Sequence, residues 1–376
     1  MRSDSPLKVL LVAEGSGGHL IPALEVAATL AKTGAHIKVW YAQRRRTVPL
    51  TDALVRPHPS IDVDAIPVEA SPNPLERLWR CGQLWHRAQR CFDTFAPDVV
   101  VGFGGWVSAP VVLAARKRRI GCLLHEQNVV MGRANQWLAP WVDRIAVSFR
   151  ETDVPSDCEA SVMTGLPVRQ GIGRTARAQA AARFGLDPDR PTLLLLGGSQ
   201  GSRAINRLMI AAAALLSPME RERWQVVHVT GPTDATAAQV AYRAHGVTAW
   251  VAPFLVEMDA AYALADVVIG RAGASTIAEL ARCGTPAVLI PYPYAGNHQR
   301  ANAALVEAIG GGVMIEESQA TPARVLGAAR RILTDHRLRL MMSRQMRELG
   351  CADAADRLRD VIVEVARLGR ESEDTG

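Results

Sequence analysis

Several features that mark metal-binding, disulfide-rich or membrane-spanning proteins are missing from this chain of 376 residues. Its six cysteines are scattered and form no C-x-x-C pair, which argues against a zinc site or a disulfide framework and favours a reducing compartment. No stretch reaches the ~18 apolar residues that a transmembrane helix needs. The first apolar run, KVLLVA at 8–13, is too short for a secretion signal and leads directly into a glycine loop. We therefore expect a cytoplasmic protein that is soluble or peripheral to a membrane.

The common nucleotide and metal motifs are absent as well. The loop GSGGHL has Leu20 where a dinucleotide fingerprint would place its third glycine, and no Walker lysine and hydroxyl follow the loop GGSQGS at 197–202. A nicotinamide-dependent oxidoreductase is therefore poorly supported. No D-x-D motif stands where a metal-dependent transferase needs one, so we expect neither a required metal nor a cofactor.

Positive charge is only in small excess. The chain has 43 Lys and Arg against 37 Asp and Glu, a net charge of +6. That excess suits anionic substrates or an anionic membrane surface as well as nucleic acid, and does not choose among them. About half of the residues are hydrophobic and about a fifth are charged, as in a folded globular protein.

Short apolar runs alternate with longer amphipathic segments along most of the chain. The runs at 8–13 and 98–103 each lead into a glycine loop and an expected helix, and the same order restarts at 191–216. This alternation predicts an α/β fold with parallel sheets covered on both faces. The length and the repeated opening predict two Rossmann-like domains, 1–168 and 169–345, with a C-terminal helix and disordered tail at 346–376.

Both glycine loops have the physical properties of an anion site. Glycine lets the backbone approach a ligand closely, and the helix that follows presents free N–H groups and the positive end of its dipole. A tight turn between a strand and a helix also needs glycine for its own sake. For either loop alone, both interpretations stay open.

The segment DVVIGRAGASTIAEL, from 266 to 280, predicts a strand, a loop and a helix that starts near 274–276. Its small residues leave the start of the helix open, so that a phosphate could lie on the N–H groups. Glu279, about one turn in, could accept two hydrogen bonds from the vicinal diol of a ribose. Alternatively, Thr276 and Glu279 form a capping box that serves the helix alone.

Six blocks of sequence follow one another between about residues 8 and 310. They are GSGGHLIPALEVA, GFGGWVSAP, HEQNVVMGRANQWLA, TGLPVR, LGGSQGSRAIN and RAGASTIAEL with PYPYAGNHQRANA. Together, and in this order, they resemble the bacterial MurG family of glycosyltransferases. The resemblance implies the GT-B fold, two Rossmann-like domains whose sheets face a cleft. It also implies transfer of N-acetylglucosamine from UDP-N-acetylglucosamine to the 4-hydroxyl of the muramoyl sugar of undecaprenyl-diphosphate-linked muramoyl-pentapeptide (lipid I to lipid II), with inversion.

The resemblance also assigns residues. It implies that 274–279 hold the UDP, with Glu279 on the ribose, and that the backbone of Leu255 recognises the uracil. Gln299 matches a contact to the donor sugar, and Arg169 matches an arginine near the donor. Apart from the resemblance, we expect Arg271 or Arg169 to offset the diphosphate, which would make a metal unnecessary. The donor residues are Ser16, Gly17, Gly18, Asn128, Arg169, Ser199, Leu255, Ala274, Ser275, Thr276, Ile277, Ala278, Glu279 and Gln299, and a cradle for the diphosphate of the acceptor is formed by Gly15, Gly104 and Gly105.

An inverting transfer needs a base that takes the proton of the acceptor hydroxyl. Histidine has a suitable pKa at neutral pH, and His19, at the end of the first glycine loop, is the candidate. His125 and Glu126 are rivals because they follow a strand. A buried structural role is the alternative for each histidine, and we favour it for His125.

The segment 74–92 predicts a helix that contacts a membrane. Leu75, Leu78, Trp79, Trp85 and Phe92 fall largely on one side, interleaved with arginines, a composition typical of interfacial helices on anionic lipid. The alternative is a helix that buries this face in the core, and we expect part of each. The resemblance implies a role in peptidoglycan synthesis, which serves cell shape and division, on the cytoplasmic face of the membrane. We expect other cell-wall proteins as partners and expect no binding of nucleic acid.

The chain departs from the family at Glu14 and Ser16, where glycine and threonine are usual, and at Leu166, where asparagine is usual. The segment 42–62 matches poorly, which concerns the acceptor side. Three other functions stay open: another GT-B transferase with a UDP-sugar and a lipid acceptor, such as a diacylglycerol galactosyltransferase, a UDP-N-acetylglucosamine 2-epimerase, and a non-catalytic UDP-sugar-binding subunit.

Overall fold

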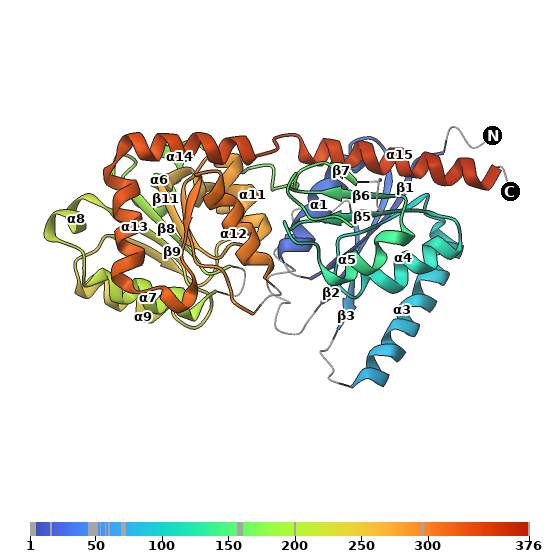
Figure 1. Ribbon diagram of the computed structural model, residues 1–376, viewed down its shortest axis with the longest axis horizontal. Coiled ribbons are helices and arrows are strands. Elements are labelled where there is room, and N and C mark those ends of the chain that lie inside the picture. Colours follow the sequence, from blue (N-terminus) through green and yellow to red (C-terminus); the bar gives the residue numbers. More distant parts are fainter. Residues whose placement is uncertain are drawn as a thin grey trace. The chain divides into compact units, whose positions relative to one another are not determined.

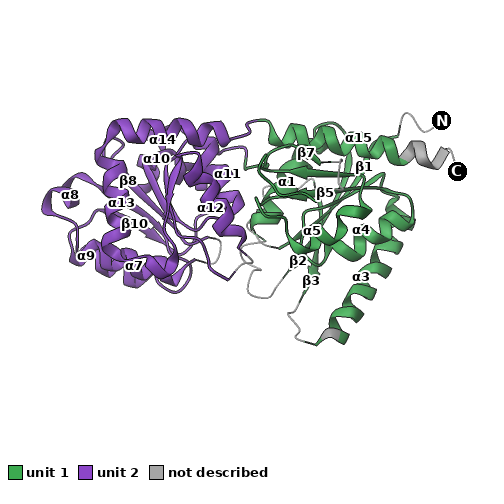
Figure 2. Ribbon diagram, viewed as in Figure 1, with its two compact units in different colours: residues 1–169, 353–376 green, residues 170–352 purple. Residues whose placement is uncertain are grey.

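The computed structural model describes residues 5–15, 17–43, 52, 54–56, 58, 61–68, 73–155, 161–198, 201–294 and 297–374. The chain divides into two compact units, Met1–Arg169 with Asp353–Gly376 and Gln170–Ala352 (Figure 2). Each unit is a parallel sheet with helices packed against it (Figure 1). The predicted α/β class with two Rossmann-like domains is therefore confirmed.

Unit 1 contains, in its described part, a sheet of seven parallel strands in the order β3-β2-β1-β4-β5-β6-β7. Its strands are β1 (Lys8–Glu14), β2 (His36–Gln43), β3 (Asp62–Pro67), β4 (Val99–Gly102), β5 (Gly121–Glu126), β6 (Arg144–Val147) and β7 (Ser161–Met163). Its helices are α1 (Gly17–Ala31), α3 (Pro74–Phe95), α4 (Ser108–Lys117), α5 (Arg133–Leu138), η2 (Ala139–Trp141) and α15 (Ala354–Asp374).

The continuous apolar run of β1 is explained by burial on both faces of the sheet. Val9 and Leu11 belong to one core cluster with α1 and α15, whereas Leu10 and Val12 belong to another with α3 and α4. Side chains alternate across a strand, so a strand covered on both faces needs apolar residues at every position.

The C-terminal helix belongs to unit 1, although the sequence analysis set 346–376 apart as a segment of its own. Helix α15 packs against α1 and β5. A Cβ on Gly121 would lie 2.7 Å from the carbonyl oxygen of Val365, and one on Gly369 would lie 2.9 Å from the nitrogen of Gly121. This close approach of two glycines lets the helix cross the start of β5. The units therefore meet in sequence at Arg169 and again at Asp353.

Unit 2 contains, in its described part, a sheet of six parallel strands in the order β10-β9-β8-β11-β12-β13. Its strands are β8 (Thr192–Leu196), β9 (Gln225–Val229), β10 (Ala249–Ala252), β11 (Val267–Gly270), β12 (Ala287–Leu289) and β13 (Gly312–Met314). Its helices are α6 (Arg177–Phe184), α7 (Arg203–Ala213), α8 (Pro218–Arg223), α9 (Ala235–Ala244), α10 (Met258–Leu264), α11 (Ala274–Cys283), α12 (His298–Ala308), η3 (Glu317–Gln319), α13 (Pro322–Thr334) and α14 (His336–Leu349).

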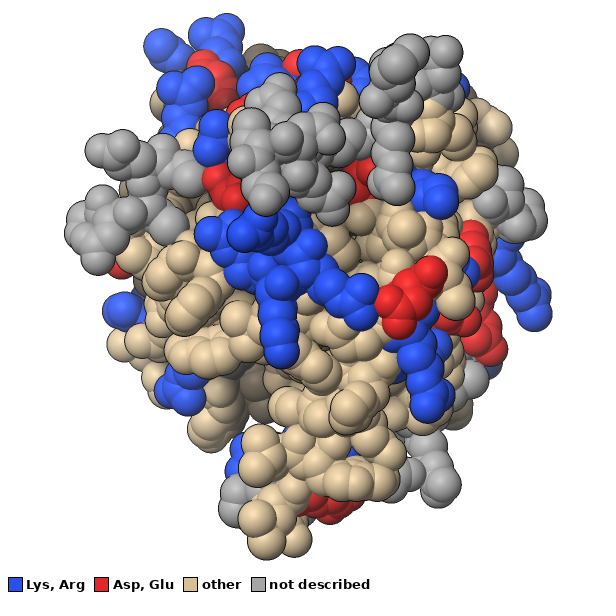
Figure 3. Space-filling view, turned by 90° about the vertical axis from the view of Figure 1, so that its right-hand side faces the viewer, with Lys and Arg blue, Asp and Glu red and all other residues tan. Residues whose placement is uncertain are grey.

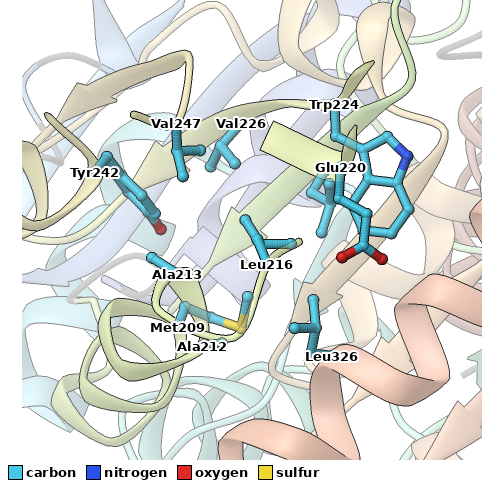
Figure 4. Close-up of a pocket in the computed structure, with 11 residues that line it drawn as sticks. Met209, Ala212, Ala213, Leu216, Glu220, Trp224, Val226, Tyr242, Val247 and Leu326 are labelled. Carbon is cyan, nitrogen blue, oxygen red and sulfur yellow. The ribbon is translucent and has the colours of Figure 1, made fainter. Parts of the chain in front are cut away.

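A small apolar hollow lies in the core of unit 2 (Figure 4). Its lining includes Leu193 and Val226, near the starts of β8 and β9, with Met209 of α7 and Tyr242 of α9. Ligands of open parallel sheets bind at the carboxyl ends of the strands. The hollow lies at the opposite ends and is therefore a packing feature of the core.

In each sheet the carboxyl ends of the parallel strands share one edge, and the glycine loops singled out in the sequence follow β1, β4, β8 and β11 at these edges. Within the described ranges, no helix is both long enough and apolar enough to cross a membrane.

Candidate active site

The first glycine loop of unit 1 leaves no room for a side chain at Gly15. A Cβ on Gly15 would lie 1.8 Å from the carbonyl oxygen of Ala42 on β2, so only glycine lets β1 end this close to its neighbour. Helix α1 starts at Gly17, and Gly18 lies in its first turn. The N–H groups at this end carry the positive end of the helix dipole. Ser16 lies outside the described residues.

His19 lies beside the second glycine loop. Gly104 and Gly105 have φ angles of 86° and 81°, which favour glycine. A Cβ on Gly104 would lie 3.5 Å from the His19 ring, and one on Gly105 would lie 2.0 Å from the Cγ of Glu14. The structure therefore brings His19 together with Gly104 and Gly105 at the ends of β1 and β4. Glu14, where the family has glycine, adds a carboxylate at the same place.

Glu126 organises the loop that follows β5. It is buried, and its carboxylate accepts four hydrogen bonds. One oxygen accepts from the backbone N–H and the side-chain amide of Asn128, at 2.9 and 3.2 Å. The other accepts from the N–H of Gly132 at 2.9 Å and from Asn135 Nδ2 at 2.8 Å. Donors of this kind offset the cost of burying a carboxylate. Glu126 thus fixes Asn128, and its occupied oxygens argue against a role as base.

His125 is a buried structural histidine in this geometry. Its Nε2 faces the carbonyl oxygen of Gly165 at 3.2 Å, and its Nδ1 faces the amide nitrogen of Gln127 at 3.1 Å. A carbonyl can only accept and an amide nitrogen can only donate, so the ring is neutral with its proton on Nε2. Burial lowers the pKa of His125 from about 6.5 to about 4. Both ring nitrogens are engaged, which argues against His125 as the base.

In unit 2, helix α11 starts at Ala274 after Gly273, as predicted, with no side chain capping its first turn. The alternative of a capping box at Thr276 is therefore wrong, because Thr276 lies inside the helix. Glu279 is buried at 5 % exposure, and its Oε2 accepts a hydrogen bond of 2.9 Å from the hydroxyl of Tyr262 on α10. An open helix start with an acid one turn in thus exists in the structure.

Gln299 and Asn302 lie at the start of α12, beside the ends of β11 and β12. Gln299 Oε1 accepts a hydrogen bond of 3.0 Å from the backbone N–H of Tyr292. Asn302 is fully buried, and its amide donates to the carbonyl oxygen of Ala272 at 3.1 Å. These two bonds tie the start of α12 to the loops after β12 and β11.

Arg271 contacts other residues of its own unit and does not have the role that we expected from the sequence. It is 8 % exposed and forms an ion pair of 2.5 Å with Glu317. Its Nη1 donates to the carbonyl oxygens of Ile290 and Pro291 at 3.0 and 3.3 Å. The guanidinium is therefore engaged inside the unit, and the expectation that it offsets the diphosphate is wrong for this geometry.

The remaining predicted residues are less defined by the structure. Leu255 is buried at 9 % exposure, as is Leu166 at 4 %. Arg169 is the last residue of unit 1 before the boundary. Ser199 lies outside the described residues, as does much of the divergent segment 42–62. The roles assigned to these residues stay predictions, as does the absence of a required metal.

Three residues that hold the site in place were missed by the sequence analysis. They are Tyr262, which contacts Glu279, and Gln127 and Asn135, which contact His125 and Glu126. Gln127 and Asn135 stand inside the block HEQNVVMGRANQWLA, so their amide side chains in a block already singled out were an available signal. Tyr262 gives none, because a tyrosine in an apolar helix is typical of a core residue.

Helix α3 buries one part of its apolar face and exposes the other. Phe92 and Leu84 are buried in the core, whereas Leu75, Leu78 and Trp79 are 74, 71 and 63 % exposed. The mixed outcome expected for this helix is therefore confirmed. Two further exposed tryptophans, Trp137 of α5 and Trp141 of η2, belong to the same unit. Lys and Arg side chains gather on the face drawn in Figure 3.

Comparisons with known proteins identify the family of this chain. The glycosyltransferase family 28 N-terminal domain matches residues 9–147, and the C-terminal domain of the same family matches residues 192–358. The UDP-N-acetylglucosamine–N-acetylmuramyl-(pentapeptide) pyrophosphoryl-undecaprenol N-acetylglucosamine transferase of Mesorhizobium japonicum is 37 % identical over 95 % of both chains. This chain belongs to the MurG family. The crystal structure of MurG from Acinetobacter baumannii is 29 % identical, with a TM-score of 0.74, and covers 96 % of this chain and 100 % of that one.

A likeness to the UDP-GlcNAc 2-epimerase of Neisseria meningitidis concerns the fold alone. The match has a TM-score of 0.69 and covers 95 % of this chain and 100 % of the epimerase chain, but the sequences are only 13 % identical. The resemblance to MurG noted in the sequence is thus confirmed, and the chain is a glycosyltransferase of family 28.

The two buried neutral histidines predict a loss of stability in mild acid. Burial lowers the pKa of both His125 and His228 to about 4, whereas an unfolded histidine titrates near 6.5. Unfolding therefore takes up protons between pH 6.5 and 4, so the free energy of unfolding should fall as the pH falls through this window, by about 3 kcal/mol for each histidine. Urea unfolding at pH 7.5, 6 and 5 measures this loss.

His228→Gln should weaken that pH dependence because it removes one of the two titrating rings. The His36→Gln variant, at an exposed position of β2, is the control and should leave the dependence unchanged. A stability that stays constant from pH 7.5 to 5 would contradict the buried neutral state.

Proposed function

We propose that this chain transfers N-acetylglucosamine from UDP-N-acetylglucosamine to the 4-hydroxyl of the muramoyl sugar in undecaprenyl-diphosphate-linked muramoyl-pentapeptide. The observation that carries the proposal is the start of α11, where the small residues Gly273 and Ala274 bring no bulky side chain to the helix N–H groups and Glu279 lies about one turn in. A diphosphate suits such N–H groups, and a carboxylate suits the ribose diol. Membership of the MurG family supports the same substrates.

In the proposed reaction, the acceptor hydroxyl attacks the anomeric carbon of the donor sugar from the side opposite to UDP. The bond from carbon to the acceptor oxygen forms as the bond to the diphosphate breaks, and His19 takes the hydroxyl proton. The open N–H groups at the start of α11 stabilise the charge that develops on the leaving UDP. The glycines Gly15, Gly104 and Gly105 hold the diphosphate of the lipid acceptor through their backbone.

His19 is preferred as base over its rivals on geometric grounds. It lies beside Gly104 and is half-buried. His125 is held neutral by burial and has partners on both nitrogens, and the Glu126 oxygens each accept two hydrogen bonds.

The Glu279→Gln variant tests the donor half of the proposal. A glutamine keeps an oxygen for the Tyr262 hydroxyl but removes the charge, so the Kd for UDP-N-acetylglucosamine should rise by about 10- to 100-fold, the value of a charged hydrogen bond. Isothermal calorimetry measures this change. Glu307→Gln, on the exposed side of α12, is the control and should bind as the unmodified protein does. An unchanged Kd together with a lower melting temperature would leave Glu279 with a structural role only.

The His19→Gln variant tests the base. Loss of a general base should lower kcat by about 10²- to 10⁴-fold, while the Kd for the donor stays nearly constant because His19 acts on the acceptor. The measurement is release of UDP in the presence of a lipid-linked muramoyl-pentapeptide analogue, with His36→Gln as the control. Equal turnover by His19→Gln and the unmodified protein would remove His19 from this role.

We also propose that the exposed end of α3 contacts an anionic membrane surface, on its cytoplasmic side. Leu75, Leu78 and Trp79 supply apolar area, and Arg77 and Arg90 of the same helix are exposed, the combination that binds interfaces. Participation of further cell-wall proteins rests on the family alone.

A double variant, Leu78→Ser with Trp79→Ser, should reduce binding to phosphatidylglycerol vesicles by tenfold or more, since each side chain contributes about 1.5–3 kcal/mol when buried. Stability should hardly change because both side chains are exposed. Co-sedimentation measures the binding, with the exposed Val240→Ser of α9 as the control. Undiminished binding by the double variant would place the membrane contact elsewhere.

A further inference from the structure

The segment after β12 links an exposed aromatic pair to Gln299. Tyr292 and Tyr294 are 43 and 81 % exposed, and their rings pack edge to face with centroids 5.5 Å apart. The backbone N–H of Tyr292 donates to Gln299 Oε1 at 3.0 Å. The position of the Gln299 side chain therefore depends on the position of the backbone at Tyr292.

Arg271 holds this segment from the buried side. Its Nη1 bonds to the carbonyl oxygens of Ile290 and Pro291, the two residues that precede Tyr292. Its guanidinium carbon lies 5.4 Å from the centre of the Tyr292 ring, a cation–π contact. Glu317 pairs with Nη2 and supplies the negative charge that a buried arginine needs. Three successive residues of the segment are thus fixed by one side chain.

This arrangement decides which end of the Gln299 amide faces outward. A backbone N–H can only donate, so the atom that faces it must be the amide oxygen. The amide nitrogen, with its two N–H donors, then projects from the other side of the same planar group. Within the described part of the chain, Tyr292 is the single hydrogen-bond partner of the Gln299 side chain.

We propose that Arg271 is a positioning residue that acts through Tyr292 on Gln299. It keeps the Gln299 oxygen turned toward the N–H of Tyr292, so that the amide nitrogen donates to the hydroxyl oxygens of the donor sugar. This inference rests on the proposed function, because it assigns the direction of one contact to the sugar of UDP-N-acetylglucosamine. Arg271 itself touches neither the sugar nor the diphosphate.

The Arg271→Met variant distinguishes this positioning role from direct contact with the diphosphate and from a purely structural role. Loss of the anchor should raise the Kd for UDP-N-acetylglucosamine about tenfold, the upper value for a neutral hydrogen bond, while the Kd for UDP stays within about twofold. Calorimetry with the two ligands gives both values. Because Arg271→Met leaves the Glu317 carboxylate unpaired, a second variant, Arg271→Met with Glu317→Met, removes both charges and should show the same selectivity.

The control is Arg300→Met, which breaks the neighbouring but exposed ion pair with Glu316 and should change neither Kd. If Arg271→Met raised the Kd for UDP and the Kd for UDP-N-acetylglucosamine equally, Arg271 would contact the diphosphate. Unchanged binding of both ligands with a lower melting temperature would mean a structural role alone. Either result overturns the proposal. If the unmodified protein bound UDP but not the UDP-sugar, the proposed function would fail, and this inference with it.

The Gln299→Glu variant tests the direction of the amide. Glutamate keeps an oxygen for the N–H of Tyr292 but replaces the donating nitrogen by an acceptor. The Kd for UDP-N-acetylglucosamine should therefore rise about tenfold, and the Kd for UDP should hardly change. In the Arg271→Met background the same change should add less than about twofold, because the two residues act on one contact. Fully additive effects would show that Arg271 and Gln299 act independently, which contradicts the coupling through Tyr292.

Discussion

Parallel strands place all of their carboxyl ends along one edge of a sheet, and in each unit one position at that edge, Gly15 or Gly270, is packed too tightly for a side chain. A Cβ on Gly15 would collide with the backbone of β2, and one on Gly270 would lie 2.8 Å from the carbonyl oxygen of Leu196. At these two positions the chain accepts only glycine, and α1 and α11 begin within the next few residues, with the positive end of each helix dipole at this edge. Affinity for an anion is thus a consequence of how the sheets are packed.

A site made largely of backbone depends on a few side chains that hold the backbone in place. Glu126 fixes the loop after β5 through four hydrogen bonds, and Arg271 fixes the segment after β12 through two carbonyl oxygens and an aromatic ring. Both are buried charges, which are stable only with their partners present. Such residues are as characteristic of the site as those that contact substrate, although they contact only the protein.

The sequence was sufficient for the features that depend on local order. Glycine loops between apolar runs predicted the parallel sheets, and the small residues after Gly270 predicted the open start of α11. It was not sufficient where a partner lies far along the chain. Arg271 resembles a phosphate ligand until Glu317 is placed beside it, and the neutral state of His125 depends on its complete burial, which the residues around it in the sequence do not show. Helix α15 looked like a separate segment because nothing local marks its contact with Gly121.

The central claim is that these two units together form a transferase that moves N-acetylglucosamine onto a lipid-linked muramoyl sugar. The most direct measurement is transfer of labelled N-acetylglucosamine from UDP-N-acetylglucosamine to a short-chain analogue of undecaprenyl-diphosphate-linked muramoyl-pentapeptide, with a chelator present. The account predicts a labelled lipid product with inverted anomeric configuration and unchanged yield in the chelator. Binding of the UDP-sugar without any transfer to this acceptor would contradict the claim.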